Sequence, residues 1–323
     1  MKTLPEFEHF FESTLRPRLE PFETRRKSIC RAWAGFLAAL GIFLLALLFA
    51  GPALGAGGGL ILGGFVAGAI VAGAVWWLLT RGFAPDFKAQ IVAEVVRFFD
   101  PGLRYGPSEC ISEGEFLESD LFRQRIDRYR GEDLVEGVLD RTALRFSEIH
   151  AEHKTETRDS KGRRRTEWHT IFKGIFFIAD FNKDFSGVTV VLPDTAERLF
   201  GFLGRKLQEM NVMRGDLVAL EDPDFEKRFV VYGTDQVEAR YVLSTALMRR
   251  IMEFQDKCGC RLYLSFARSS VYLGIARTRD AFEPAYFRSL LAFESIRPYF
   301  DDLQLITGIV ENLNLNTRIW TKT

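Results

Sequence analysis

The feature that most constrains this chain is an uncharged apolar run from residue 32 to residue 79, which contains no Asp, Glu, Lys, Arg or His. About 20 apolar residues already span the hydrocarbon core of a bilayer, so the run holds two such lengths. Backbone amides in hydrocarbon must be hydrogen-bonded within the segment, which favours helices. We therefore predict a transmembrane helical hairpin, with spans at 32–50 and 57–79 and a turn at 51–56.

The basic residues that flank the run predict its orientation. Seven Lys or Arg residues lie in the segment 1–31, the turn has no charge, and Arg81, Lys88 and Arg97 follow the second span. Basic flanks stay on the cytoplasmic side, so both termini are expected there, in a multi-pass protein of a bacterial inner membrane. A cleaved signal peptide is the alternative, but the leader before the apolar run is long and acidic for that purpose.

The segment 1–31 carries an apolar stripe at helical spacing. Its members are Leu4, Phe7, Phe11, Leu15, Leu19 and Phe22, and Pro17 and Pro21 are expected to interrupt the helix. One interpretation is a helix on the inner leaflet, with Arg25, Arg26 and Lys27 against anionic lipid. The other is a helix that packs on the chain's own soluble domain.

Small residues recur every fourth position in the hairpin, from the end of the turn into the second span. One row is Gly55, Gly59 and Gly63, and a second is Gly64, Gly68 and Ala72. Such rows let helix backbones approach closely, and the partner is either the first span or another membrane protein or copy of the chain. Neither span contains an ionisable side chain, which argues against a transporter or a proton path.

The remainder divides into a juxtamembrane helical segment, 80–140, and a cytosolic α+β domain, 141–323. Helical spacing predicts one helix at 86–99 and two short ones within 112–129.

In the second part we expect a mixed or antiparallel sheet with packed helices. Alternation and turn residues predict strands at 143–157, 164–181, 188–192, 217–220, 227–232, 261–266 and 271–276. Helices are expected from Asp194, over 245–257 and from Pro298. Apolar residues at 175–178 on both faces predict that this strand is central.

Composition narrows the function classes. Lys plus Arg and Asp plus Glu both number 43, and a balance of zero argues against a nucleic-acid binder. The four cysteines are too few and too unevenly spaced for a disulfide framework and are expected to be reduced thiols. No cofactor motif is present, and no cofactor is expected.

Three runs resemble a known family. They are EFLESDLF at 115–122, DFNKDFSGVTVVLPD at 180–194 and LEDPDFEKRFVVYGTDQVEARYVLSTALM at 220–248. Together they are similar to an uncharacterised bacterial family of proteins with a two-helix membrane anchor, often encoded beside LemA-type proteins. The resemblance covers most of the chain after Asp86. It implies the anchor, a cytosolic domain and a LemA-type membrane partner, but no activity and no catalytic residue.

Two groups of residues have the side-chain types of metal or redox sites. A turn at 159–162 would place His153 opposite His169 on paired strands, with His150 on the other face, which is the start of a zinc site or a pair of exposed strand residues. The run Cys258-Gly259-Cys260 lacks the C-x-x-C spacing of a redox or metal pair. No metal site is therefore predicted.

Two further groups are candidate contact sites. Lys161, Arg163, Arg164 and Arg165 at a hairpin tip suit anionic lipid or an acidic partner, although a solvated loop explains them as well. Tyr232, Asp235, Glu238 and Arg240 form a strand-to-helix corner where side chains could converge on a ligand, and helix capping by Asp235 is the alternative.

No residue pattern predicts a reaction. The hypothesis that follows is a membrane-anchored interaction, scaffold or accessory module, in contact with the bilayer and with a membrane protein or a second copy. The alternatives are a membrane-tethered enzyme with an unidentified site, near the corner or the histidine hairpin, and a module that senses anionic lipid.

Overall fold

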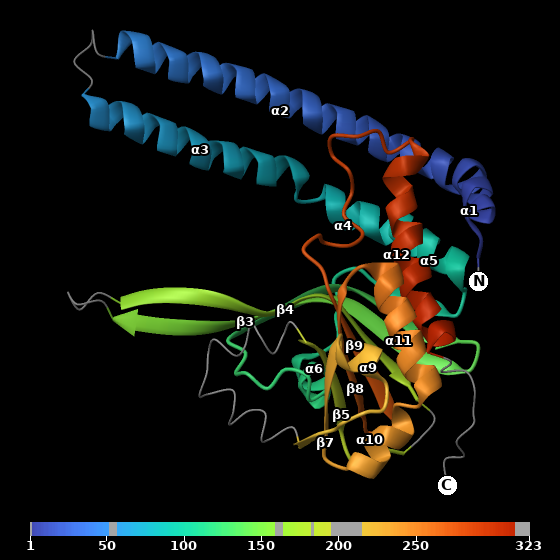
Figure 1. The fold of residues 1–323 in the computed structure, drawn as a ribbon. Helices are drawn as coiled ribbons and strands as arrows, with labels where there is room; N and C mark the ends of the chain where they lie inside the picture. Colours follow the sequence, from blue (N-terminus) through green and yellow to red (C-terminus); the bar gives the residue numbers. More distant parts are fainter. Residues whose placement is uncertain (1, 52–56, 159–163, 182–183, 195–214, 314–323) are drawn as a thin grey trace. The chain divides into compact units, whose positions relative to one another are not determined.

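The structure is a computed structural model that describes residues 2–51, 57–158, 164–181, 184–194 and 215–313. The chain folds into two compact units. The helical unit contains residues 2–95 and 282–300, and the sheet unit contains residues 96–281 and those from 301 onward. Each unit is described by itself below, with the element labels of Figure 1.

The helical unit begins with one nearly continuous helix. Its parts are α1 (Leu4–Phe10), a π-helical turn (Phe11–Leu15) and α2 (Arg16–Ala50). The expectation that Pro17 and Pro21 interrupt this helix is wrong. Pro17 lies in the first turn of α2, and Pro21 lies inside α2 on its exposed side, where water can satisfy the carbonyl that loses its backbone donor.

The other helices of this unit are the second span and those that come after it. They are α3 (Gly58–Thr80), α4 (Phe83–Phe87), a second π-helical turn (Lys88–Val92), the start of α5 (Ala93–Phe99) and the first part of α12 (Phe293–Asn312). The helix predicted at 86–99 is confirmed. Helix α12 begins at Phe293, one turn before the predicted start at Pro298, because Ile296 already belongs to the buried apolar face.

The N-terminal apolar stripe is buried inside the helical unit. Phe7 stacks on Phe300 with ring centroids 4.7 Å apart, and Phe11 meets Phe293 at 5.5 Å. Phe22 packs edge-on against Phe87 at 5.6 Å. Of the two interpretations of this stripe, the structure supports packing within the protein, because its aromatic side chains are already covered by protein.

Helices α2 and α3 lie side by side as an antiparallel pair (Figure 1). Both are long and apolar enough to cross a membrane. Their large apolar side chains are exposed: Ile42 by 70%, Phe49 by 77% and Ile70 by 68%. The turn predicted between them at 51–56 lies, after Gly51, outside the described residues.

The strands of the sheet unit are β1 (Leu103–Gly106), β2 (Arg128–Leu139), β3 (Thr142–Arg158), β4 (Arg164–Asp180), β5 (Thr189–Pro193), β6 (Asp216–Leu217), β7 (Phe229–Gly233), β8 (Arg261–Ala267) and β9 (Ser270–Ala276). Over the described ranges they form one nine-stranded sheet with the order β1-β2-β3-β4-β9-β8-β5-β7-β6. Every pairing is antiparallel. The predicted α+β class is confirmed.

The sheet is buried on both faces around β4. Residues 175–178 of β4 are at most 7% exposed, which confirms the prediction that this strand is central. On one face Phe176 and Tyr272 share a core cluster with Phe116 of helix α6 (Glu113–Glu118). On the other face the alternating neighbours Phe177 and Leu273 are also buried. Figure 1 shows α6 and α11 on opposite sides of the strands.

The short helices of the sheet unit have the caps that their sequences predict. Ser112 accepts from the Glu115 amide at the start of α6, and Ser244 accepts from the Leu247 amide at the start of α11 (Thr245–Cys258). Helix α11 ends at Gly259, whose φ of 59° suits glycine. Helices α9 (Pro223–Glu226) and α10 (Gln236–Val242) complete the unit. The helix predicted from Asp194 falls on residues 195–214, outside the described residues.

The predicted helical segment 80–140 is wrong in its second half. It contains β1 and β2, and residues 121–127, expected to be helical, have no helix. The run Gly131-Glu132-Asp133 has the composition of a turn but lies within β2, at a bulge where the register with β3 shifts and Asp133 has a φ of 63°. A bulge adds unpaired residues to a strand without ending it.

Candidate functional site

A break in strand pairing creates a cavity in the sheet unit. Strand β4 pairs with β9 only from Gly174 to Asp180, and β3 pairs with β2 only as far as Glu152. The rest of the hairpin, residues 153–158 and 164–173, is here called the β3–β4 arm (Figure 1). Strand β4 separates from β9 at Gly174. Glycine is required there because a Cβ would lie 2.0 Å from the Ile275 carbonyl oxygen and the φ of this residue is 148°.

The cavity lies beside the base of this arm and has a volume of about 1000 Å³. Apolar side chains of the sheet form part of its wall, including Phe172 and Tyr263. The start of β8 and the residues that follow β9 supply the polar part, including Arg261, Arg277 and Asp280. A mixed apolar and charged lining of this size suits a small ligand or a short peptide segment.

A stacked pair of histidines lies at the arm side of the cavity. His153 and His169 are directly opposite in the β3–β4 register, as predicted, and their ring centroids are 4.9 Å apart. The Thr155 hydroxyl lies 2.9 Å from His169 Nε2, whereas His153 Nδ1 is buried without a hydrogen-bond partner. Burial, together with His169, lowers the pKa of His153. The neutral form of the His153 ring is therefore favoured.

These histidines do not belong to a larger ligand cluster. In the part of the chain that the structure describes, no group of three or more His, Cys, Asp or Glu residues is placed to hold a metal ion. His150 is an odd number of residues from His153 on an unbulged stretch of β3 and thus faces the other side of the sheet. Its Nε2 lies 3.8 Å from Glu152 instead.

Two ion pairs border the cavity. Lys173 Nζ lies 2.7 Å from Asp280, and Arg277 lies 2.6 Å from Asp302. Asp280 also interacts with Glu148, which is 8% exposed and accepts a hydrogen bond from the Ala281 amide at 2.8 Å. Burial and the neighbouring Asp280 raise the pKa of Glu148 to about 8. A buried carboxyl that is neutral at pH 7 therefore adjoins a residue of the cavity wall.

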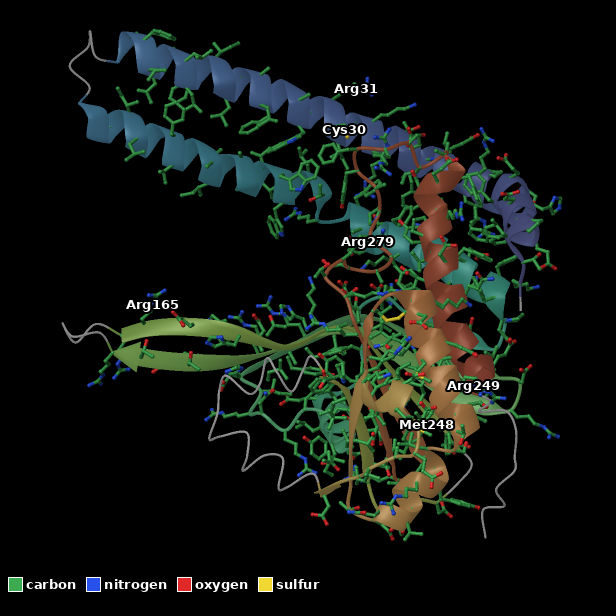
Figure 2. All side chains as sticks on the ribbon, viewed as in Figure 1. Cys30, Arg31, Arg165, Met248, Arg249 and Arg279 are labelled. Atoms are coloured by element: carbon green, nitrogen blue, oxygen red, sulfur yellow. A yellow bond between two sulfur atoms is a disulfide. The ribbon has the colours of Figure 1, made fainter. Side chains whose placement is uncertain are left out.

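A disulfide between Cys258 and Cys260 also lines the cavity and appears as a yellow bond in Figure 2. The expectation that all four cysteines are reduced is wrong for this pair. The left-handed turn at Gly259 brings the two Cα atoms to 5.2 Å, within bonding range, although the sequence spacing is not C-x-x-C. Cys30 and Cys110 are free thiols.

The predicted ligand corner is occupied by the protein itself. Asp235 caps α10 by accepting from the Val237 and Glu238 amides, and the Glu238 carboxylate accepts from the Ser186 and Gly187 amides. Arg240 donates to the Ala219 carbonyl, and Tyr232 is 7% exposed. These contacts hold the loop before β5 against α10, and the capping interpretation explains the corner.

The basic residues predicted at the hairpin tip are described only in part. Lys161 and Arg163 lie outside the described residues. Arg164 and Arg165 begin β4 on the exposed arm, where Arg165 pairs with Glu167 at 3.0 Å (Figure 2). Their contact with lipid or an acidic partner stays a prediction.

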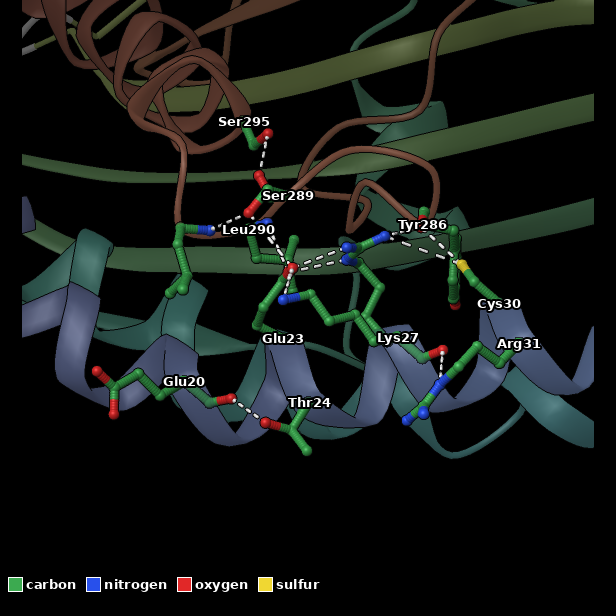
Figure 3. A network of polar contacts seen from close by, with 12 residues as sticks. Glu20, Glu23, Thr24, Lys27, Cys30, Arg31, Tyr286, Ser289, Leu290 and Ser295 are labelled. Carbon is green, nitrogen blue, oxygen red and sulfur yellow. Dashed lines mark hydrogen bonds and ion pairs between the residues drawn. The ribbon is translucent and has the colours of Figure 1, made fainter.

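The basic residues before the first span, Arg25, Arg26 and Lys27, are not all available to contact lipid. Arg26 is 9% exposed, donates to both oxygens of Glu23 at 2.7 and 2.8 Å and donates to the Tyr286 carbonyl at 2.8 Å (Figure 3). The predicted lipid contact of Arg26 is therefore wrong. Arg25 is more exposed and pairs with Asp86, and Lys27 lies 3.6 Å from Glu23.

The two glycine rows of α3 have different surroundings. A Cβ on Gly64 or Gly68 would meet leucines of α2, Leu47 at 2.3 Å and Leu40 at 3.3 Å respectively. A Cβ on Gly59 or Gly63 would meet nothing within 4 Å, and Gly55 lies outside the described residues. The second row is thus the contact between the two apolar helices.

Sequence reasoning missed the three features that make this site. The cavity depends on where β9 leaves β4, the high pKa of Glu148 depends on burial, and the disulfide depends on one glycine conformation. Only Gly259 gave a local signal, because it also predicted the end of α11.

Residues 170–315 match a family described as "Protein of unknown function (DUF3137)". No curated protein matches the chain. Among solved structures, the chain resembles the "crystal structure of the mycobacterial trehalose monomycolate transport factor A, TtfA", with 10% identity and a TM-score of 0.34. That alignment covers 70% of this chain and 96% of the other. A likeness of this strength carries no argument about function.

Proposed function

We propose that this chain is a membrane-anchored protein whose sheet unit serves as an interaction module, as a scaffold or an accessory subunit. One observation carries the proposal: large apolar side chains are exposed along α3 and along α2 from Leu37 onward. In these stretches the two helices cover each other where they meet, as at Gly68 and Leu40. An exposed apolar surface of this extent is stable only against lipid or another apolar surface.

The two ends of the hairpin fit the chemistry of a bilayer. From residue 32 to residue 50, α2 rises about 28 Å at 1.5 Å per residue, close to the thickness of the hydrocarbon core. Aromatic rings gather where both helices leave the apolar zone: Trp33 and Trp76 are 5.2 Å apart, and Phe287 stacks on Trp76 at 5.5 Å. The guanidinium of Arg81 lies over Trp77. Such belts form at the membrane interface.

The proposal includes an orientation and a partner. The proposed orientation has both termini in the cytoplasm of a bacterial cell, in a multi-pass inner-membrane protein, and the basic flanks support it. The partner is a membrane protein, of LemA type by the family resemblance, or a second copy. Among the described residues, no third strand pairs with the outer part of the β3–β4 arm. This supports an interaction role, because such strand edges present backbone donors and acceptors to another chain.

Charge substitutions test the anchor. A double variant, Ile42→Arg with Ile70→Arg, puts a charge near the middle of each span, at a cost of about 2.5–3.5 kcal/mol per residue in insertion. We expect much of the variant to be lost from the membrane fraction after carbonate washing. The matched control is Val237→Arg, which is 77% exposed on α10 and should leave membrane retention unchanged. Full release of the wild-type chain by carbonate would contradict the anchor.

The interaction role is tested by purification in mild detergent with a quantitative readout. We expect a specific protein, or a second copy, to co-elute at a fixed ratio, and the ratio to fall when Thr170→Pro distorts the backbone of the arm. The same substitution on the exposed α10, Val237→Pro, controls for lost stability of the sheet unit. A monomer that carries a bound small molecule would overturn the scaffold role.

The cavity supports a second candidate, a membrane-tethered enzyme or small-molecule binding protein. The observation that favours it is the joint presence of the His153–His169 pair and the perturbed Glu148 next to a cavity of about 1000 Å³. Native mass spectrometry of the purified chain would reveal a ligand, and His169→Ala should release it. The lipid-sensing alternative has less support, since the N-terminal stripe is covered by protein.

A further inference from the structure

We propose that Cys258 and Cys260 form a redox-active pair that exchanges its disulfide with a dithiol of another protein. This activity goes beyond the proposed anchoring and interaction roles. It is argued from how the two residues are held and from where their sulfurs lie.

The disulfide closes a ring of only three residues, in a place that is already fixed by other bonds. The Gly259 amide donates to the Gln255 carbonyl at 2.9 Å and ends α11. Directly after the pair, Arg261 is in register with Ala276 at the start of the β8–β9 ladder. Closing so short a loop restricts the unfolded chain little, so the bond contributes less to the stability of the fold than a long-range disulfide would. The fold can therefore persist with two thiols.

The sulfurs are also accessible. Both cysteines are partly exposed and line the cavity described above. The same cavity is lined by Lys173, Arg261 and Arg279, cations that favour an incoming thiolate. Among the described residues, no strand pairs with the edge of the β3–β4 arm that borders the cavity beyond Lys173, whose carbonyl accepts from the Arg277 amide at 3.0 Å. An extended segment that carries the dithiol can lie on this edge. A structural disulfide is instead usually shielded from such an approach.

The geometry also assigns the order of the two steps. The Cys260 amide lies 3.2 Å from Cys258 Sγ and donates to it, which stabilises negative charge on that sulfur. A thiolate of the partner attacks Cys260 Sγ, the intramolecular bond breaks, and Cys258 leaves as a thiolate and takes up a proton. The second thiolate of the partner then attacks the partner's sulfur in the mixed disulfide. Cys260 leaves as a thiolate and takes up a proton. Two electrons and two protons pass from the dithiol to this chain.

The test uses the full chain in detergent, with dithiothreitol and glutathione buffers as probes. Differential alkylation and peptide mass spectrometry report each cysteine separately, so that Cys30 and Cys110 are internal controls. We expect the pair to convert reversibly between disulfide and dithiol across the glutathione ratios of cells, with one equivalent of dithiothreitol consumed per chain. Near-ultraviolet circular dichroism should be unchanged by reduction.

Three results would overturn the proposal: a pair that stays oxidised until the protein is denatured, a pair that stays reduced in oxidised glutathione, or a fold that is lost on reduction. The order of steps has its own check. When glutathione attacks the disulfide of the wild-type chain, the mixed disulfide trapped by alkylation should form several-fold more often on Cys260 than on Cys258, because Cys258 leaves as the stabilised thiolate. Equal amounts on the two cysteines would overturn the assigned order, and none of these results bears on membrane anchoring.

Discussion

Glu148 shows how one buried side chain makes stability depend on pH. Its pKa in the folded protein is raised to about 8 by burial and by Asp280. Between about pH 4.5 and pH 8 the folded chain therefore holds a proton that the unfolded chain has released, and the free energy of unfolding falls as pH rises. We expect Glu148→Gln, which can still accept from the Ala281 amide, to raise stability at pH 8.5 by about 1–3 kcal/mol and to change it little at pH 5.

Thermal unfolding in detergent at three pH values measures this effect. Glu156→Gln is the control on the same strand, since Glu156 is exposed and pairs with Lys154. The pKa of Glu156 is lowered by that lysine, so its substitution should not stabilise the protein at high pH. A Glu148→Gln profile parallel to the wild-type profile would show that Glu148 titrates normally.

The lowered pKa of Glu23 predicts that the free energy of unfolding of the helical unit has the opposite pH dependence. The Arg26 guanidinium holds the pKa of Glu23 at about 2 despite burial, and the Leu290 amide donates to the same carboxylate at 2.9 Å. Its contribution is complete above about pH 4.5 and is lost as pH falls toward 2. We expect Glu23→Gln to cost about 3–5 kcal/mol at pH 7, because it leaves Arg26 buried without its anion.

A double-mutant cycle separates the attraction between Glu23 and Arg26 from the free-energy cost of burying their charges. Adding Arg26→Met to Glu23→Gln should recover a large part of the lost stability, measured by thermal unfolding at pH 7. The exposed pair Arg16–Glu12 serves as the comparison, and Glu12→Gln should cost no more than about 0.5 kcal/mol. Strictly additive losses at Glu23 and Arg26 would contradict a coupled pair.

At the scale of elements, the glycine rows of α3 predict which face packs against α2. Gly68→Leu should push the helices apart and lower the melting temperature of the helical unit by several degrees, because a Cβ there already lies 3.3 Å from Leu40. Gly63→Leu is the matched control five residues earlier, where a Cβ has open space. If both variants melt alike in detergent, this packing is wrong. A change of oligomeric state in Gly63→Leu alone would indicate that the open row binds a second copy.

Elements governed by local chemistry could be predicted from the sequence. The β3–β4 hairpin, the pairing of His153 with His169 and the caps of α6 and α11 depend on alternation, turn residues and side chains within a few positions. Strand β2 could not be found in this way. Its Gly131 and Asp133 have the composition of a turn, and only pairing with β3, which supplies the missing backbone partners, makes this stretch a strand.

The candidate site was harder to predict because distant segments make it. The cavity exists where β4 continues beyond β9. At its border, Asp302 of α12 forms an ion pair with Arg277, which is distant in the sequence. Neither fact has a local signal. The same holds for Glu148, whose neighbour Asp280 is far away in the chain, and for Arg26, whose basic character suggested lipid although Glu23 and Tyr286 surround it.

At the scale of the whole molecule, orientation links the anchor to the redox proposal. The basic residues before the first span and after the second outnumber those of the uncharged turn, which predicts that both ends remain in the cytoplasm. In that compartment thiols are kept reduced, so a disulfide at Cys258–Cys260 would form only as a transient, catalytic or sensing state. Reporter proteins fused before Met1 and after Thr323 should both be active in the cytoplasm. Labelling of Cys110 in intact cells by a membrane-impermeant maleimide is the independent check and should be absent until the membrane is permeabilised. An exported reporter and a labelled Cys110 would reverse the topology and would make the disulfide the ordinary resting state of the pair.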